Sequence, residues 1–343
     1  MINFTLDNLP IYISGILTKQ LGYSEADISD LQITEITEQT YVNYIFKIEF
    51  STNGKKTTYY LRQTRDHVRT RPDIKLDPAR IEFEVKILRL LNSIQPGVVP
   101  EVIYFDETNN SVILTDIRNN NPLLVDELLN GNPHPETADY FGKVIATYHT
   151  KTINIDHSQV HGSEVTNDAA VKFHLGMRLE PALKEFPELT DKLITISNQS
   201  IKCLVLGDLA SKNIVVDSSK IRFMDLERAF VGDPTFDLAF LFCHYLIEIK
   251  PDAVDQSLLF IQQFMESYLS VIKKFLPEQE LALLQNRILR FLGVTILYRF
   301  FGLYLVVNVE RDTNKWHEVA HQLLQDTTSC NVSKKLNPLI NHS

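Results

Sequence analysis

The chain has 343 residues, of which 44% are hydrophobic and 22% are charged, so it can bury a large core and is long enough for about two domains. Its formal net charge of -9 at pH 7 disfavours a nucleic-acid partner, because a phosphate backbone would be repelled. The three cysteines, Cys203, Cys243 and Cys330, are widely spaced, which favours reduced thiols over a disulfide framework and predicts a cytoplasmic location.

The first third of the chain is typical of a small sheet preceded by a helix. We expect the leading helix over about residues 7–30, and strand-like sequence runs from Ile33 to Asp116. Tyr41–Phe50 is rich in β-branched and aromatic residues, Asn53-Gly54 is a hairpin turn signal, and Thr57–Leu61 returns as the second strand.

One helix interrupts this sheet. Asp77-Pro78 supplies a cap and a first-turn proline, and apolar residues then recur at helical spacing, at Ile81, Val85, Leu88 and Leu91. Two further strands, Val98–Phe105 and Val112–Leu114, are separated by a polar turn cluster. The pattern is sheet, one helix, sheet.

The remainder is mostly helical, with long amphipathic segments at Asp139–His149, Leu179–Phe186, Ser257–Phe275 and Glu280–Val307. Three short apolar runs, Cys203–Leu206, Ile214–Asp217 and Ile221–Met224, indicate an embedded hairpin over residues 204–227. The sequence therefore predicts an α+β, two-lobed, protein-kinase-like fold, with a nucleotide-binding lobe over residues 1–118 and a helical lobe over residues 119–343. Phe291–Val307 is apolar enough to suggest a membrane span, but Arg299 in its middle would cost about 2.5–3.5 kcal/mol, so we predict a buried helix and no membrane partner.

The residues that carry chemistry lie around the embedded hairpin. Phosphoryl transfer needs a carboxylate that accepts the alcohol proton, and oxygen ligands that hold Mg²⁺ on the phosphates. Asp208, Asn213, Asp225 and Glu227 can supply these groups, because a hairpin carries the chain from Asn213 back to Asp225. Either aspartate alone could be a turn or cap residue; their joint spacing favours function.

The same region resembles a known family. Asp208 with Asn213, then Asp225, Gly232-Asp233-Pro234 and Asp237-Leu238-Ala239, is similar to the aminoglycoside phosphotransferase and choline kinase family. A narrower resemblance, to the methylthioribose kinases, is carried by further motifs: Leu61-Arg62-Gln63, Phe83-Glu84, Asp225-Leu226-Glu227-Arg228-Ala229-Phe230, and Arg299 with Gly302-Leu303.

The resemblance implies a role for each matching position. Asp208 would be the catalytic base, while Asn213, Asp225 and Glu227 would bind Mg²⁺. ATP would contact Arg62, Glu84 and Asn43, with Thr115, Asp116 and Ile117 as the hinge beside the adenine. Arg299 and Asp237 would lie on the substrate side. The acceptor pocket would be built from residues of about Asn167–Glu188 and Tyr298–Tyr304.

The chain departs from the family pattern at three places. Arg62 stands where a lysine normally pairs with the glutamate, the expected phosphate-covering loop Glu38–Asn43 contains no glycine, and Leu206 replaces a histidine. Lys47 could supply the missing lysine from a neighbouring strand, although a solvated lysine on a strand face is the simpler interpretation.

Two functions follow from these observations. The first is an ATP-dependent small-molecule kinase that phosphorylates a hydroxyl group of a methylthioribose-like sugar, an aminoglycoside or an amino alcohol. The alternative is a catalytically degenerate kinase fold that binds a nucleotide, a metabolite or a protein partner. The sequence leaves the oligomeric state open between monomer and homodimer.

Overall fold

The structure is a computed structural model that describes residues 1–343 except 39, 157–159, 161–177, 218–219, 303–311, 326–330 and 342–343. The chain divides into two compact units, Met1–Asn119 and Asn120–Ser343. We call them unit 1 and unit 2 and describe each by itself.

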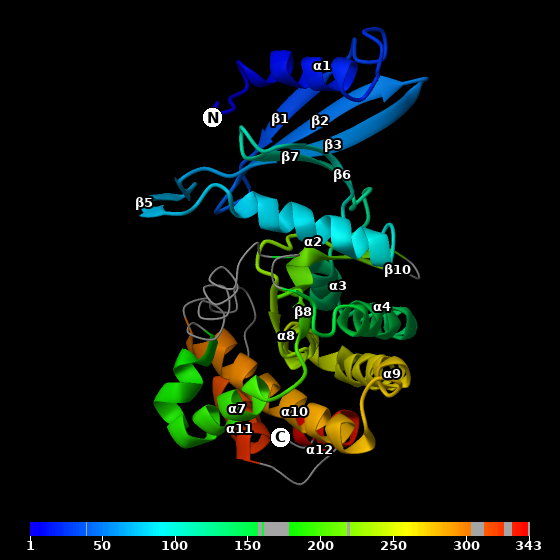
Figure 1. Ribbon diagram of the computed structural model, residues 1–343. Helices are drawn as coiled ribbons and strands as arrows, with labels where there is room; N and C mark the ends of the chain where they lie inside the picture. Colours follow the sequence, from blue (N-terminus) through cyan, green and yellow to red (C-terminus); the bar gives the residue numbers. More distant parts are fainter. Residues whose placement is uncertain are drawn as a thin grey trace. The chain divides into compact units, whose positions relative to one another are not determined.

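Unit 1 is built on a five-stranded antiparallel sheet with the strand order β1-β2-β3-β7-β6 (Figure 1). Its strands are β1 Gln32–Ile36, β2 Tyr44–Thr52, β3 Lys55–Gln63, β6 Val102–Asp106 and β7 Ser111–Thr115. The predicted hairpin is confirmed: Thr52 pairs with Lys55, and Asn53 and Gly54 adopt φ angles of 51° and 73° between them. Asparagine and glycine tolerate this left-handed conformation, which a two-residue turn requires.

Helix α1, Leu9–Lys19, packs on one face of this sheet through Leu9, Ile13, Ile16 and Leu17. The facing side chains come from alternate positions of β2, namely Phe46, Ile48 and Phe50, all 2% exposed or less. The helix is shorter than the expected span of residues 7–30. It ends at Lys19 because the chain turns at Gly22, whose φ of 76° is not helical.

Helix α2, Arg80–Ile94, follows a small hairpin of β4, His67–Val68, and β5, Arg71–Lys75. The helix begins at Arg80, two residues later than the cap expected at Asp77-Pro78, and its N-cap residue is Ala79. The Asp77 side chain accepts a hydrogen bond from the backbone N–H of Ala79 at 2.9 Å, in the turn before the helix. The β4–β5 hairpin was not predicted. All five residues of β5 are exposed, so the sequence has no alternation of apolar and polar residues that would indicate this strand.

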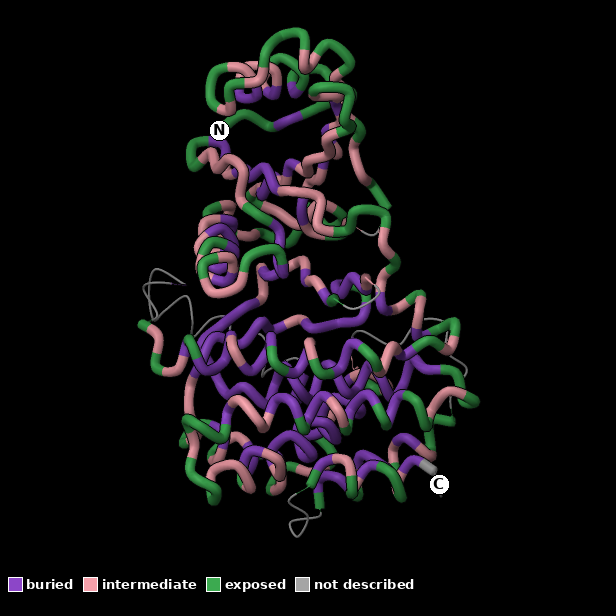
Figure 2. The backbone as a smooth tube through the Cα atoms, turned by 90° about the vertical axis from the view of Figure 1, so that its right-hand side faces the viewer, coloured by how far each residue is buried: buried purple, intermediate pink, exposed green. Residues whose placement is uncertain are grey.

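Unit 2 is mostly helical. Its helices are α3 Leu124–Asn130, α4 Ala138–Lys151, α7 Pro187–Asn198, α8 Thr235–Ile247, α9 Val254–Ile272, α10 Glu278–Phe301, α11 Thr313–Gln325 and α12 Val332–Asn341, with a further helical segment at 178–185 and short 3-10 turns at Pro135–Thr137, Ser211–Asn213 and Pro251–Ala253. Every residue of α8 is buried, so this helix is the centre of the unit. Figure 2 shows the contrast between buried stretches and outer helices that alternate between buried and exposed residues.

Helix α10 is long and apolar enough to cross a membrane by length and composition, but 72% of its apolar window is buried inside the protein. It is therefore a core helix, as predicted from Arg299. A buried ion pair joins the middle of α10 to the residues just before α8: Arg287 Nε lies 2.9 Å from Asp233 Oδ2. Asp233 also accepts a hydrogen bond from the backbone N–H of Thr235, the first residue of α8.

Four short strands are embedded among these helices. β9, Ile214–Asp217, pairs with β10, Lys220–Phe223, while β8, Cys203–Val205, pairs with β11, Phe230–Gly232. The second pairing brings the chain after the hairpin back to the strand that precedes residues 206–213. The sequence predicted the β9–β10 hairpin but not the β8–β11 pair, which joins residues far apart in the chain.

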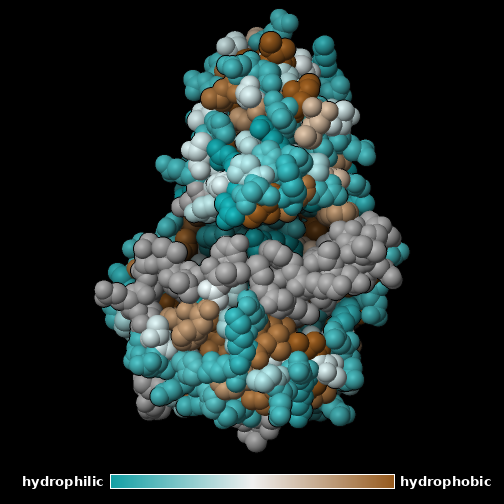
Figure 3. Space-filling view, turned by 90° about the vertical axis from the view of Figure 1, so that its left-hand side faces the viewer, coloured by the Kyte–Doolittle hydropathy of each residue, from teal (hydrophilic) through white to brown (hydrophobic). Residues whose placement is uncertain are grey.

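The α+β class predicted from the sequence is confirmed, with an antiparallel sheet in unit 1 and a helical unit 2. Cys203 and Cys243 are buried and unpaired. On the face in Figure 3, hydrophilic side chains cover most of the described surface, and the apolar ones form separate small groups. Scattered exposed hydrophobic side chains of this kind are ordinary for a globular protein.

Candidate active site

The loop from Leu206 to Asn213 is the centre of the predicted site. Asn213 Nδ2 donates hydrogen bonds to Asp208, at 3.2 Å to Oδ2 and 3.1 Å to the backbone oxygen. Asn213 is held in turn by the β9–β10 hairpin, because its carbonyl accepts the N–H of Met224 at 3.0 Å. The structure therefore brings Asp208 and Asn213 together, with the Asp208 side chain 11% exposed.

Gly207 allows the loop its shape. Its φ is 82°, and a Cβ at this position would lie only 2.1 Å from the carbonyl oxygen of Arg228. No residue with a side chain fits there without movement of the backbone. The close approach holds the residue before Asp208 against the segment that follows Asp225.

Asp237 holds the same loop from α8. Its carboxylate accepts the N–H of Leu206 at 2.7 Å and that of Gly207 at 2.9 Å, and it lies 3.1 Å from His149 Nε2. Because a carboxylate can only accept, His149 is the donor. Asp237 is 1% exposed, so the structure places this predicted substrate residue in the core, beneath the loop.

Asp225 lies two residues after the end of β10 and has a φ of 65°, which non-glycine residues seldom adopt. Short polar side chains such as aspartate tolerate this conformation best, and strained residues often mark functional sites. Within the described residues, no group of three His, Cys, Asp or Glu side chains is arranged to hold a metal. Mg²⁺ needs fewer protein ligands when phosphates complete its coordination, and Asn213 and Asp225 offer the oxygen atoms it prefers, so this donor set fits the ion.

In unit 1 the structure brings Arg62 and Glu84 together. Arg62 Nη1 donates to both carboxylate oxygens of Glu84, at 2.7 and 2.9 Å, and the two side chains are 12% and 3% exposed. Asn43, which is 6% exposed, accepts a hydrogen bond from Arg80 Nη2 at 2.7 Å. Both predicted nucleotide-side residues are thus anchored to α2.

Lys47 shares a face of the sheet with Arg62. In the β2–β3 register Arg62 pairs with Ile45, and Lys47 is two residues further along β2, so their side chains leave the sheet on the same side. Lys47 Nζ, however, lies 2.8 Å from Glu49. The structure therefore pairs Lys47 within its own strand.

The predicted hinge ends β7. Thr115 donates its N–H to the Glu101 carbonyl at 3.0 Å and its side-chain oxygen accepts the Glu101 N–H at 2.9 Å. Asp116 Oδ1 accepts the N–H groups of Arg118 and Asn119 at 3.0 and 3.1 Å, which forms a tight turn after the strand. Ile117 lies inside this turn.

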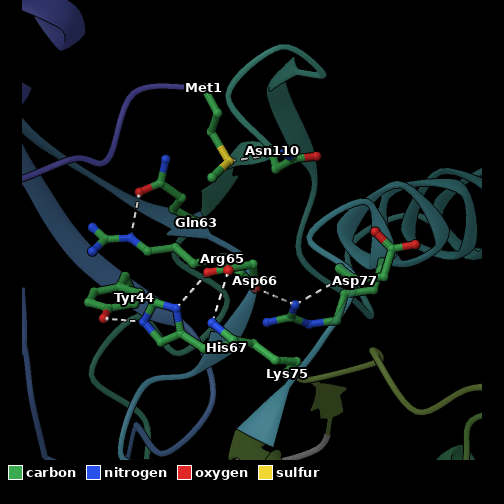
Figure 4. A network of polar contacts seen from close by, with 10 residues as sticks. Met1, Tyr44, Gln63, Arg65, Asp66, His67, Lys75, Asp77 and Asn110 are labelled. Carbon is green, nitrogen blue, oxygen red and sulfur yellow. Dashed lines mark hydrogen bonds and ion pairs between the residues drawn. The ribbon is translucent and has the colours of Figure 1, made fainter. Parts of the chain in front are cut away.

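A network of arginines surrounds the segment that was expected to cover the phosphates. Arg69 donates to the carbonyl of Ile36 at 3.2 Å, to both oxygens of Thr40, and to Glu35 at 2.9 Å. Arg65 stacks on the ring of Tyr44, with Cζ 3.4 Å from the ring centroid. Figure 4 shows Arg65 reaching Gln63, and Asp66 joining His67 and Lys75 beside it. The loop lacks glycine but is tied at both ends by side chains.

Arg299 is the other predicted substrate residue. Its Nη2 lies 3.3 Å from Glu248 Oε1, and its side chain is 17% exposed. Glu248 also contacts His244 Nδ1 at 2.8 Å and accepts from Ser211, so this cluster lies next to the loop that carries Asp208. The predicted acceptor-pocket segments fall partly outside the described residues, since 167–177 and 303–304 are not described.

Sequence reasoning did not identify Arg178. Its Nη2 donates to the Gly207 carbonyl at 2.6 Å and lies 3.6 Å from Asp208 Oδ1, although 29 residues separate it from Gly207. Its Cζ also lies 4.0 Å from the centroid of the Phe240 ring. No local motif marks this arginine, because its partners come from elsewhere in the chain.

Comparisons with known proteins show the family and the fold of the chain. A model of the phosphotransferase enzyme family matches residues 48–264. No curated protein matches the chain in sequence.

Solved structures show the fold. An ethanolamine kinase from Plasmodium vivax is similar with a TM-score of 0.58 and 14% identity, covering 98% of this chain and 90% of that one. A choline kinase from Cryptosporidium parvum gives 0.55 and 16%, with 97% of each chain covered. The GDP and kanamycin complex of APH(2'')-IIIa gives 0.51 and 18%, with 95% and 99% covered.

Proposed function

Because the chain belongs to the phosphotransferase enzyme family, we propose that it is a small-molecule kinase that transfers the γ-phosphate of ATP to a hydroxyl group. In the reaction, the acceptor O–H bond breaks and a new O–P bond forms. The bond between the γ-phosphorus and its bridging oxygen breaks, ADP leaves, and the proton goes to Asp208.

The observation that supports it best is the arrangement of Asp208. This carboxylate is 11% exposed, contacts Asn213, and stands on a loop that Asp237 holds by two backbone hydrogen bonds. A base must be fixed within hydrogen-bond reach of the proton it accepts. The positioning that phosphoryl transfer depends on is therefore built into unit 2.

On the nucleotide side, Arg62 would neutralise phosphate charge while Glu84 fixes its orientation. Asn43 and the hinge Thr115–Ile117 would contact the nucleotide. Asn213 and Asp225, with Glu227 as a further candidate, would hold Mg²⁺. When bound, this ion neutralises charge on the β- and γ-phosphate oxygens.

We propose a small molecule with a hydroxyl group as the acceptor. The similar structures are an ethanolamine kinase, a choline kinase and a phosphotransferase in complex with GDP and kanamycin, and the narrower sequence resemblance is to methylthioribose kinases. We propose that Arg299 lies on the substrate side.

We assign Asp237 to positioning of the loop, because it is buried and its oxygens accept hydrogen bonds from the backbone of Leu206 and Gly207. Free buried thiols at Cys203 and Cys243 support a cytoplasmic reaction.

The test measures ADP formation from ATP and Mg²⁺ with ethanolamine, choline, kanamycin and methylthioribose as acceptors. Asp208→Asn should lower kcat by about 10²–10⁴-fold, because the carboxylate no longer accepts the proton. The matched control is Asp217→Asn, which removes a carboxylate at the end of the same hairpin, paired 2.5 Å from Arg222. Near-parental turnover by Asp208→Asn would refute the proposed base.

The second candidate is a kinase fold that binds a nucleotide without turnover. It is favoured by Arg62 in place of lysine, since Arg62 Nη1 is already engaged by both oxygens of Glu84. Thermal unfolding with ATP and Mg²⁺ detects nucleotide binding, and product formation separates the two candidates. Binding at a hundred times the dissociation constant adds about 2.7 kcal/mol of stability in either case. Only the enzyme also forms ADP and phosphorylated acceptor.

A further inference from the structure

Hydrogen bonds hold the two peptide groups that flank the Cα of Gly207. Asp237 accepts its N–H at 2.9 Å, and Arg178 donates to its C=O at 2.6 Å. The two holding groups are 1% and 6% exposed, so neither hydrogen bond competes with bulk water. The residue that follows, Asp208, therefore projects from a peptide with little freedom to rotate.

Arg178 also supplies the positive charge nearest to Asp208 among the described residues that contact it. Its Nη2 lies 3.6 Å from Asp208 Oδ1, close enough for a strong electrostatic attraction in a largely buried site. The Phe240 ring, 4.0 Å from Cζ, packs against the flat guanidinium and restricts its orientation. Burial lowers the pKa of Arg178, the Asp208 charge opposes this, and an arginine in a protein stays charged.

We propose that Arg178 is a positioning residue for phosphoryl transfer, which acts through Asp208 by holding both the Gly207–Asp208 peptide and the Asp208 carboxylate. This inference rests on the proposed function. Arg178 reaches the loop that carries Asp208 from the helical segment 178–185, outside the loop and hairpin motifs. Without Arg178, the Asp208 carboxylate, which is 11% exposed, would lose its cationic neighbour, and the Gly207 carbonyl would lose its hydrogen-bond donor.

The experiment compares Arg178→Gln, Arg178→Lys, Asp208→Asn and the double variant Arg178→Gln/Asp208→Asn. The readouts are kcat for the acceptor that the parent phosphorylates best, and the dissociation constant of ATP. Arg178→Gln should lower kcat by about a hundredfold, since a misplacement of 1 Å has that effect, and leave ATP affinity unchanged. Arg178→Lys should recover part of the loss, because it restores the charge without the planar group that stacks on Phe240.

The double variant distinguishes positioning from a general structural role. If Arg178 acts through Asp208, removing both should be no slower than Asp208→Asn alone. Multiplicative effects, or an Arg178→Gln kcat within about threefold of the parent, would overturn the proposal. If Arg178→Gln does not fold, the same comparison is made with Arg178→Lys and its double variant.

Arg287→Gln is the matched control. Arg287 is 4% exposed and ion-paired to Asp233 in the same unit, so its loss should lower thermal stability while the folded protein keeps its kcat.

A parent protein that forms no ADP with any acceptor would refute the proposed function, and the role of Arg178 with it. A parent that is active, with Asp208→Asn inactive and Arg178→Gln as fast as the parent, would refute the role of Arg178 alone.

Discussion

Replacing Gly207 with alanine tests whether the rate of phosphoryl transfer depends on the geometry of the loop that carries Asp208. The new Cβ would lie 2.1 Å from the Arg228 carbonyl oxygen, whereas real Cβ contacts essentially never fall below 3.0 Å, so the backbone must move by about 0.9 Å. A displacement near 1 Å at a reacting group lowers the rate by about a hundredfold. We therefore expect Gly207→Ala to lose about two orders of magnitude in kcat for phosphoryl transfer.

Gly97→Ala is the matched control for this prediction. Gly97 has a φ of 78°, close to that of Gly207, but a Cβ there meets nothing within 4 Å. Both variants carry the cost of a left-handed alanine, about 1–2 kcal/mol, and only Gly207→Ala adds the collision. Steady-state kinetics and thermal unfolding of the two proteins separate these effects. Equal kcat values, with equal losses of Tm, would refute the link between the loop and catalysis.

Three further predictions concern charged side chains. Arg69→Gln should speed amide hydrogen exchange over residues 36–43 and weaken ATP binding about three- to tenfold, because fewer molecules hold the loop in place; unchanged exchange would contradict this. Arg62→Met should weaken ATP binding in calorimetry while Arg62→Lys retains it; equal affinities would exclude Arg62 from the nucleotide site. Burial raises the pKa of Glu248, but the charges of His244 and Arg299, with the Ser211 hydrogen bond, outweigh it and the net shift is downward from 4.5. A depressed carboxyl pKa contributes stability above pH 4.5 that is lost as the pH falls further, so Tm should drop less in this range for Glu248→Gln than for the parent.

Features with local causes could be predicted from the sequence. The Asn53-Gly54 turn fixes the β2–β3 hairpin through backbone preferences of those two residues alone. The five-residue interval between Asp208 and Asn213 was enough to predict that the two lie on one loop, where they now form a hydrogen bond. The pairing of Arg62 with Glu84 came instead from a family resemblance.

Features that depend on distant partners could not be predicted. Arg178 meets Gly207 across 29 residues, and Arg69 reaches Ile36 across 33. A single sequence contains no signal for such contacts, because an arginine on a helix or loop is most often solvated. The family resemblance placed Asp237 on the substrate side, whereas its burial and its hydrogen bonds to Leu206 and Gly207 appear only in the folded chain.

The ionisable and polar groups around the loop favour an active enzyme over an idle fold. Asp208, Asp237, Arg178 and His149 are all largely buried, and each contacts the loop or a residue that holds it. Buried ion pairs add little net stability, since hydrophobic replacements of similar volume are often as stable or more so. Stability alone therefore does not explain why several such groups gather at one loop. In the proposed mechanism they share control of the direction in which the Asp208 carboxylate points, and a protein that only bound nucleotide would gain nothing from such control.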